Sequence, residues 1–228
     1  MTRNVALDTD PPRVPGPAAS EMATWTPEEL RSFLGAIASH RLASAYVLAA
    51  STGMRRGEIL GLRWNDLDLA KATLAVRQTI ISVGYELQIS GPKTNRSRRT
   101  ISLDPGTTQE LLAHQLRQDQ ERSDCGSGWQ EHDLVFCLPD GRPVHPHQFS
   151  QLFERTVERL GLRRIRLHDL RHTYATLALL AGVDAKTVSA RLGHSTVAFT
   201  LDVYTKAVPQ LDREAAEKVA KLIFGQPD

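Results

Sequence analysis

Two basic side chains in the second half of the chain are placed to act together on an anion. His168 and Arg171 stand three positions apart at the start of an expected helix, so their side chains share one helical face. The first turn of a helix also offers backbone amides that favour a negative charge. A guanidinium suits a phosphate because its planar fork donates paired, charge-assisted hydrogen bonds. The pair alone is a weak signal, because His168 as a helix cap and Arg171 in a surface ion pair would give the same spacing.

Breaking a phosphodiester without a metal needs a nucleophile, cations on the nonbridging oxygens and an acid for the leaving oxygen. Arg55 and Arg171 are the candidate cations, and Tyr204 is the candidate nucleophile. A phenol has a reference pKa of roughly 10, so it needs a base or cationic surroundings before it attacks at neutral pH. Ordinary alternatives remain for single residues: Tyr204 could pack beside Leu201, and His194 could merely follow a helix-ending glycine.

Five short motifs occur in the order and spacing of one enzyme family. They are Thr52-Gly53-Met54-Arg55-Arg56-Gly57-Glu58, then Lys93 in a turn between strands, Leu167-His168-Asp169-Leu170-Arg171-His172, Leu192-Gly193-His194, and Tyr204. Each motif alone would arise often by chance, whereas the ordered set is specific. From about Trp25 to its end, the chain resembles the catalytic domain of the tyrosine recombinases, the phage integrase family.

The resemblance implies a role for each matched residue. Arg55 and Arg171 would clamp the scissile phosphate, and Tyr204 would attack it. His168 would accept or donate a proton near Tyr204. Lys93 would be the general acid that protonates the leaving 5′-oxygen, in preference to the arginines near it.

Two further matched residues have supporting roles in this interpretation. His194 would hydrogen-bond a nonbridging oxygen, and Glu58 would orient the site. The other arginines of the matched and basic segments are assigned to contacts with the DNA backbone, although a solvated charged face is the common meaning of such runs. They are Arg56, Arg96, Arg98, Arg99, Arg163, Arg164 and Arg166.

The implied reaction is site-specific recombination of double-stranded DNA. The joint would be to the DNA 3′-phosphate, and four protomers, monomeric when free, would exchange strands in pairs. A phosphotyrosyl bond keeps the energy of the broken phosphodiester, so no metal or nucleotide cofactor is expected and the reaction should be reversible. An accessory DNA-bending protein is a partner that the sequence leaves open. Two rival functions also stay open: strand relaxation of the type IB topoisomerase kind, and a noncatalytic DNA-binding regulator on the same fold.

Composition places the chain among ordinary globular proteins, with 41% hydrophobic residues in 228. The net charge of +2 is far below that of a dedicated nucleic-acid wrapper. Cys125 and Cys137 have no neighbours at zinc-ligand spacing and do not indicate a disulfide framework. No apolar run approaches the roughly 20 residues of a membrane span, and no signal peptide is evident. A soluble protein of the bacterial cytoplasm is expected.

Capping signals and apolar periodicity predict a mainly helical chain. Thr26, Pro27 and Glu29 form the start of a first helix with a capping box. Further helices are expected over residues 42–52, 55–62, 108–122, 146–160, 169–181, 184–193 and 211–224, and one capped by Ser195 or Thr196 would carry Tyr204.

β-branched residues predict strands over 72–83, 87–89, 100–103 and 134–138. The expected fold class is therefore α+β, mainly α-helical with a small antiparallel sheet, the fold of tyrosine recombinase catalytic domains.

The expected domain boundaries are a flexible leader over residues 1–23, a catalytic domain over 24–209, and a C-terminal amphipathic helix and tail over 210–228. Ala215, Val219, Leu222 and Ile223 lie on one side of that helix. Periodicity cannot distinguish packing on its own domain from docking on a neighbouring protomer. The leader has no room for the N-terminal DNA-clamping domain usual in the family, so the chain is expected to be a fragment with low DNA affinity of its own.

Overall fold

The computed structural model describes residues 23–91, 98–193, 197 and 209–225. The helices are α1 (Pro27–Ile37), α2 (Ala43–Thr52), α3 (Arg56–Leu60), α4 (Pro105–Cys125), α5 (Pro146–Arg159), α6 (Asp169–Leu180), α7 (Ala185–Leu192) and α9 (Pro209–Phe224). The strands are β1 (Leu67–Asp68), β2 (Thr73–Val76), β3 (Thr79–Val83), β4 (Glu86–Ser90) and β5 (Arg99–Ser102), and short 3-10 turns lie at Trp64–Asp66 and Gly126–Gly128. A mainly helical α+β fold was predicted, and the structure confirms it.

The helix starts follow the capping residues. At α1 the Thr26 hydroxyl accepts from the Glu29 amide and the Glu29 carboxylate accepts from the Thr26 amide, so the predicted capping box is present. Asp184 caps α7 through the amide of Thr187. These side chains satisfy amides that have no partner within the helix, which fixes where each helix begins.

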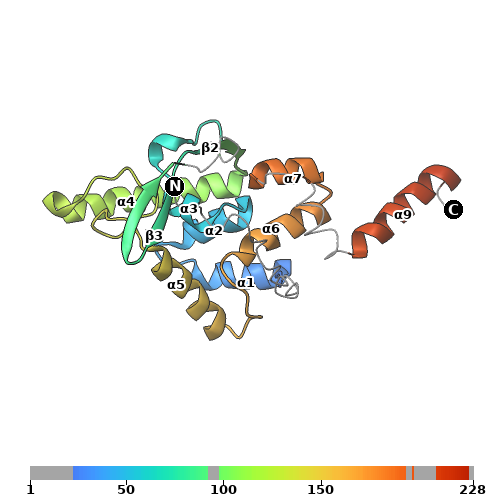
Figure 1. The fold of residues 1–228 in the computed structure, drawn as a ribbon, viewed down its shortest axis with the longest axis horizontal. Coiled ribbons are helices and arrows are strands. Elements are labelled where there is room, and N and C mark those ends of the chain that lie inside the picture. The colour runs from blue at the N-terminus through green and yellow to red at the C-terminus, as the bar shows by residue number, and fades with distance from the viewer. Residues whose placement is uncertain (1–22, 92–97, 194–196, 198–208, 226–228) are drawn as a thin grey trace, which may run out of the picture.

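The main core surrounds α2, which contacts α1, α3, α4 and α6. Trp25, Phe33, Tyr46, Phe149 and Phe153 are buried together there, and the Tyr46 and Phe149 rings stack at 4.3 Å. A smaller apolar cluster joins α6 to α7. α6 therefore contributes Leu170 to the main core and Ala175, Ala178 and Leu179 to the smaller one, and it lies beside α7 in Figure 1.

The strands form two antiparallel sheets, where the sequence predicted one. β2 lies between β1 and β5, with Leu74 opposite Ile101, whereas β3 and β4 form a separate hairpin. The predicted strand over residues 72–83 is divided between Val76 and Thr79 because β2 pairs with β5 and β3 with β4. Strand propensity alone does not reveal where a chain changes pairing partner.

The predicted strand over residues 134–138 is wrong. Only isolated bridges occur, Arg63 with Leu134 and Cys137 with Pro143. The Val135 amide donates to the Leu62 carbonyl, and the Val135 carbonyl binds His114 and Gln118. The segment is apolar because it is a buried core connection whose backbone is satisfied mainly outside a sheet.

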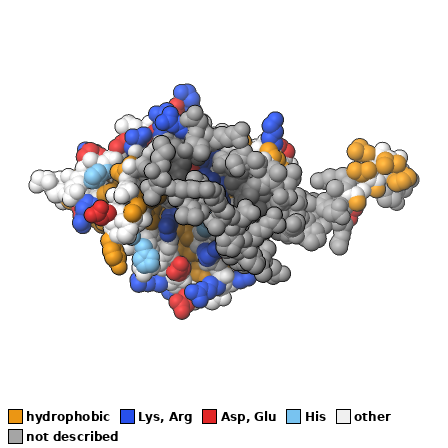
Figure 2. All heavy atoms as spheres, in the orientation of Figure 1, with side chains coloured by type: hydrophobic (Ala, Val, Ile, Leu, Met, Phe, Trp, Pro, Cys, Tyr) orange, Lys and Arg blue, Asp and Glu red, His pale blue; other side chains and the backbone are white. Residues whose placement is uncertain are grey.

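The C-terminal helix α9 stands apart from the rest of the described chain in Figure 1. Its side chains at Val219, Leu222, Ile223 and Phe224 are exposed, and Figure 2 shows apolar groups gathered at this end. None of the described helices is long and apolar enough to cross a membrane.

Candidate active site

Arg171 is held inside the protein by backbone carbonyls. The residue is buried, and only 3% of its surface is exposed to solvent. One terminal nitrogen donates to the Gly53 carbonyl at 2.7 Å and the other to the Leu192 carbonyl at 2.8 Å. This placement excludes the ordinary interpretation of Arg171 as half of a surface ion pair.

Arg55 precedes α3 and is fixed by Glu58, one turn into that helix. The Glu58 carboxylate accepts from the Arg55 amide at 2.9 Å and from its guanidinium at 2.9 Å. A second guanidinium nitrogen of Arg55 lies 3.4 Å from the Gly193 carbonyl. The carboxylate that the sequence assigned to orienting the site therefore contacts the candidate cation directly.

Glu58 also receives a second guanidinium. Arg99 binds it in a bidentate pair, with distances of 3.0 and 2.8 Å. Burial alone would raise the pKa of Glu58, but hydrogen bonds and charge from Arg99, with those from Arg55, outweigh it and the pKa is lowered. Glu58 is therefore an anion shared by two arginines.

The C-terminal end of α7 is the point where these arginines meet. The last carbonyls of a helix have no partner inside it. Here the Arg191, Leu192 and Gly193 carbonyls accept from Arg99, Arg171 and Arg55 respectively. Cations are also favoured at this end by the helix dipole.

Gly193 allows the arginines to approach this closely. Its φ is +68°, a left-handed conformation that favours glycine. A Cβ at this position would lie 3.1 Å from a terminal nitrogen of Arg99. The glycine of the Leu192-Gly193-His194 motif thus ends α7 and also leaves room for Arg99.

A pocket of about 480 Å³ opens beside these groups. Its lining includes Arg55, Arg56, Arg166, His168 and Arg171 from two separated segments, together with Ser150 and His147 of α5. The predicted convergence of His168 and Arg171 on one space is therefore present in the fold. Four arginines and one carboxylate, Glu154, line this space, and that excess of positive charge suits a phosphate, so we refer to it as the phosphate pocket.

The two histidines of the matched motif lie side by side. The rings of His168 and His172 have centroids 5.2 Å apart. Partial burial and the charge of Arg171 lower the pKa of His168, and burial with the neighbouring His168 lowers that of His172 to about 4. Both rings are therefore neutral at pH 7, and His168 makes no side-chain cap of α6.

Four predicted site residues lie outside the described residues: Lys93, Arg96, His194 and Tyr204. Their assigned roles stay predictions. The neighbouring residues are described, because Gly193 immediately precedes His194 and β4 and β5 come before and after the segment that contains Lys93 and Arg96.

The arginines predicted to contact DNA lie in different surroundings. Arg56 is exposed and donates to Ser150, and Arg166 pairs with Asp169 beside the pocket. Arg98 is exposed, whereas the side chain of Arg99 is only 7% exposed and faces Glu58. The sequence placed Arg99 among surface contacts because a run of arginines does not show which one points inward.

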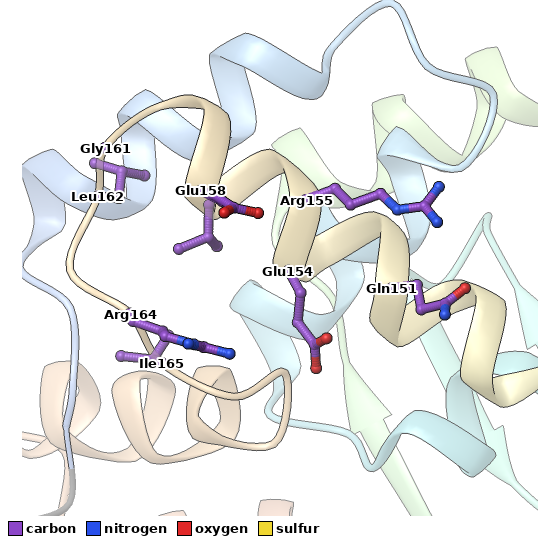
Figure 3. A pocket seen from close by; sticks show the side chains of 9 residues that line it. Gln151, Glu154, Arg155, Glu158, Gly161, Leu162, Arg164 and Ile165 are labelled. Atoms are coloured by element: carbon purple, nitrogen blue, oxygen red, sulfur yellow. The ribbon is translucent and has the colours of Figure 1, made fainter.

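The remaining two predicted DNA contacts lie away from the phosphate pocket. Arg163 approaches Glu29 at 3.8 Å. Arg164 lines a separate pocket of about 500 Å³ beside α5, shown in Figure 3, with Glu154 and Glu158 among its other lining side chains. Two carboxylates and two arginines, Arg155 and Arg164, line that pocket, so it lacks the excess of positive charge found in the phosphate pocket.

Sequence reasoning missed the backbone carbonyls that hold the arginines and the contribution of Arg191. The Arg191 guanidinium donates to the Tyr174 hydroxyl and to the Ser102 carbonyl, which ties α7 to α6 and β5. No side-chain motif encodes a carbonyl acceptor. Among the described residues, no group of histidine, cysteine or acidic side chains is arranged to hold a metal.

Comparison with known proteins decides the family. The sequence pattern of the phage integrase family matches residues 24–210. The chain belongs to this family. It is 33% identical over 217 residues to a tyrosine recombinase XerC-like protein of Caldanaerobacter subterraneus subsp. tengcongensis, covering 90% of this chain and 56% of that protein. It is 31% identical over 217 residues to the integrase of Mycobacterium phage L5, and the match covers 93% of this chain and 56% of that integrase.

Solved structures show the same fold at lower identity. The Tn1549 transposon integrase in complex with circular intermediate DNA superposes with a TM-score of 0.71 at 24% identity, covering 93% of this chain and 69% of that chain. The catalytic domain of bacteriophage HP1 integrase superposes with a TM-score of 0.56 at 16% identity, and the match covers 90% of this chain and 99% of that chain. This phage integrase homologue spans about half the length of the curated relatives that it matches.

Proposed function

We propose that this phage integrase homologue is a site-specific DNA recombinase that cleaves and rejoins strands through a 3′-phosphotyrosyl intermediate on Tyr204. The observation that carries the proposal is the pocket in which Arg55, Arg171 and His168 converge. Both guanidiniums are fixed before any substrate binds, by Glu58 and by the carbonyls at the end of α7. Charge that is already in position stabilises a phosphoryl transition state without reorganisation at the moment of reaction.

The proposed step is an in-line displacement at phosphorus. The phenolic oxygen of Tyr204 forms a bond to phosphorus while the bond to the 5′-oxygen breaks, and the phenolic proton passes to a base. Lys93 would protonate the departing 5′-oxygen, and His194 would hydrogen-bond a nonbridging oxygen. One phosphodiester is exchanged for another, so no nucleotide cofactor or metal is needed and the reverse step rejoins a strand.

His168 is suited to receive the phenolic proton. Partial burial and Arg171 lower the pKa of His168, so its imidazole is neutral at physiological pH and has an acceptor nitrogen. Its place in the pocket lining, beside Arg171, is where a proton acceptor for this reaction is required.

The proposed partner is double-stranded DNA, with further copies of this chain. Arg56 and Arg166 at the pocket would contact phosphates next to the scissile one. The catalytic domain would extend over residues 24–209, and the apolar face of α9 would dock on the next protomer of a tetramer assembled on DNA. The exposure of Leu222 at 87% and Phe224 at 82% supports docking in trans over packing in cis.

A trapping experiment tests the reaction class. A nicked suicide duplex with candidate attachment sequence is incubated with the chain in the absence of metal, and products are separated on a denaturing gel. We expect a covalent protein–DNA band that Tyr204→Phe abolishes, since the phenylalanine lacks the attacking oxygen.

The same assay separates the rival functions. The experiment is repeated with the chain joined to an N-terminal DNA-clamping domain, because shared phosphate contacts raise affinity. Absence of a band in both forms would contradict the proposal and favour a noncatalytic DNA-binding regulator. A band accompanied by relaxation of supercoiled plasmid, without exchange between two duplexes, would instead favour topoisomerase activity.

A further inference from the structure

Glu58 binds two arginines that line different pockets. Arg55 lines the phosphate pocket, whereas Arg99 lines a separate depression beside β2 and β5. The Arg99–Glu58 pair is nearly enclosed, with side-chain exposures of 7% and 6%, whereas the Arg55 side chain is 41% exposed. Arg99 therefore acts on the carboxylate from the side away from the phosphate.

The charge balance of this triad depends on Arg99. Glu58 with Arg55 alone would form a neutral pair, in which the carboxylate offsets the charge offered to a phosphate. Arg99 adds a second positive charge, so that the three side chains together carry one positive charge. Because the Glu58–Arg99 contact is enclosed, water screens it weakly and its effect on Arg55 is correspondingly strong.

Arg99 also connects the triad to α7. Its Nε donates to the Arg191 carbonyl at 2.6 Å, two residues before the Gly193 carbonyl that accepts from Arg55. Gly193 supplies an independent indication, because a side chain there would press on the Arg99 guanidinium. The end of α7 is thus packed around Arg99 as well as around Arg171.

We propose that Arg99 is a positioning residue for phosphate binding. It offsets the negative charge of Glu58 from the side away from the pocket, so that the positive charge of Arg55 acts on the scissile phosphate. Arg99 acts through Arg55 and does not itself touch the DNA. The inference rests on the proposed function of the pocket and assigns to Arg99 a role different from the DNA-backbone contact predicted from its sequence.

The first test measures the cleavage rate of Arg99→Met at saturating suicide duplex. We expect a loss of roughly 10- to 100-fold, less than direct removal of a transition-state donor would give. Arg99→Lys keeps the charge but not the bidentate fork, so it should lose less. A duplex with a methylphosphonate at the scissile position has no charge on that group, and the defect of Arg99→Met should shrink on it, as should that of Arg55→Ala.

A charge-balanced double variant gives the sharpest test. Arg99→Met with Glu58→Gln returns the triad to one positive charge, because Arg55 is then its only ion. We expect the double variant to cleave the ordinary duplex several-fold faster than Arg99→Met alone. Arg31→Met is the matched control, because Arg31 forms an exposed i,i+3 pair with Glu28 outside the site and its loss should change the rate less than twofold.

Sulfate binding tests the inference without any cleavage. Calorimetry with inorganic sulfate at low ionic strength should show weaker binding in Arg99→Met, recovery in the double variant, and little effect of Tyr204→Phe. Equal rate losses on the charged and methylphosphonate duplexes, or no recovery of rate or sulfate affinity in the double variant, would overturn the role of Arg99. A wild-type chain that forms no Tyr204-dependent bond would overturn the proposed function instead, while the order of sulfate affinities would still decide the role of Arg99.

Discussion

Four of the arginines around the phosphate pocket form an interior group and a rim group. Arg171 and Arg99 are enclosed and donate to backbone carbonyls at the end of α7. Arg56 and Arg166 are exposed and bind side chains at the protein surface, Ser150 and Asp169. The same residue type therefore occurs in one protein as a fixed donor and as a solvated cation.

The two groups separate the fixed orientation of a hydrogen-bond donor from the general attraction between a surface cation and DNA. An interior guanidinium has little conformational freedom left to lose when a phosphate binds, so its interaction energy is available to stabilise the transition state. A rim guanidinium is screened by salt and adds mainly to the association with a polyanion. Substitutions in the two groups should therefore have different signatures.

The largest expected effect is that of Arg171→Ala. The change removes a candidate phosphate ligand and leaves the Gly53 and Leu192 carbonyls without this donor. We expect cleavage to fall by about 10²–10³-fold, and the free energy of unfolding to fall by roughly 2–4 kcal/mol. Suicide-substrate kinetics and urea denaturation measure the two losses.

The control for Arg171 is an exposed arginine in an ion pair. Arg122→Ala removes a surface pair with Glu131 and should change stability by no more than about 0.5 kcal/mol. Equal losses of stability in the two variants would contradict the structural role given to the buried Arg171.

A smaller effect is expected from His172, a half-buried ring beside the exposed His168. The pKa of His172 is about 4 in the folded chain against 6.5 for the free side chain. The unfolded chain therefore binds more protons between these values, and the stability that His172 contributes is complete above pH 6.5 and is lost as pH falls towards 4. The loss is at most about 3 kcal/mol.

His172→Gln should flatten this acid dependence. Urea denaturation at several pH values between 4 and 7 measures the slope for the variant and for wild type. The exposed His132→Gln serves as the comparison and should leave the slope nearly unchanged. An unaltered slope in His172→Gln would show that its ring is not the source of the acid sensitivity.

The smallest expected effect is that of Arg56→Gln at the rim. Loss of one phosphate contact should weaken DNA binding several-fold and reduce the slope of log affinity against log salt by about one. Fluorescence anisotropy over a salt series measures both quantities. A loss of cleavage at saturating DNA as large as that of Arg171→Ala would place Arg56 in the interior group and contradict the comparison.

Much of the fold could be predicted from local signals. The capping box at Thr26 and the Asp184 cap mark the starts of α1 and α7 correctly, because a cap needs only residues within one turn. The strand over residues 134–138 and the single sheet were wrong because the partner of an apolar extended segment lies elsewhere in the chain. Pairing is a tertiary property, and residue type alone does not contain it.

The sequence by itself determined the family and the residue types available for phosphate chemistry, since the ordered motifs from Thr52 to Tyr204 are present in the chain itself. Only the tertiary structure decided which arginines are fixed and by what. The acceptors of Arg171 are the carbonyls of Gly53 and Leu192, which every residue possesses and no motif distinguishes. Likewise Arg99 differs from the exposed Arg98 only through the fold, because β5 directs it towards Glu58 and the end of α7.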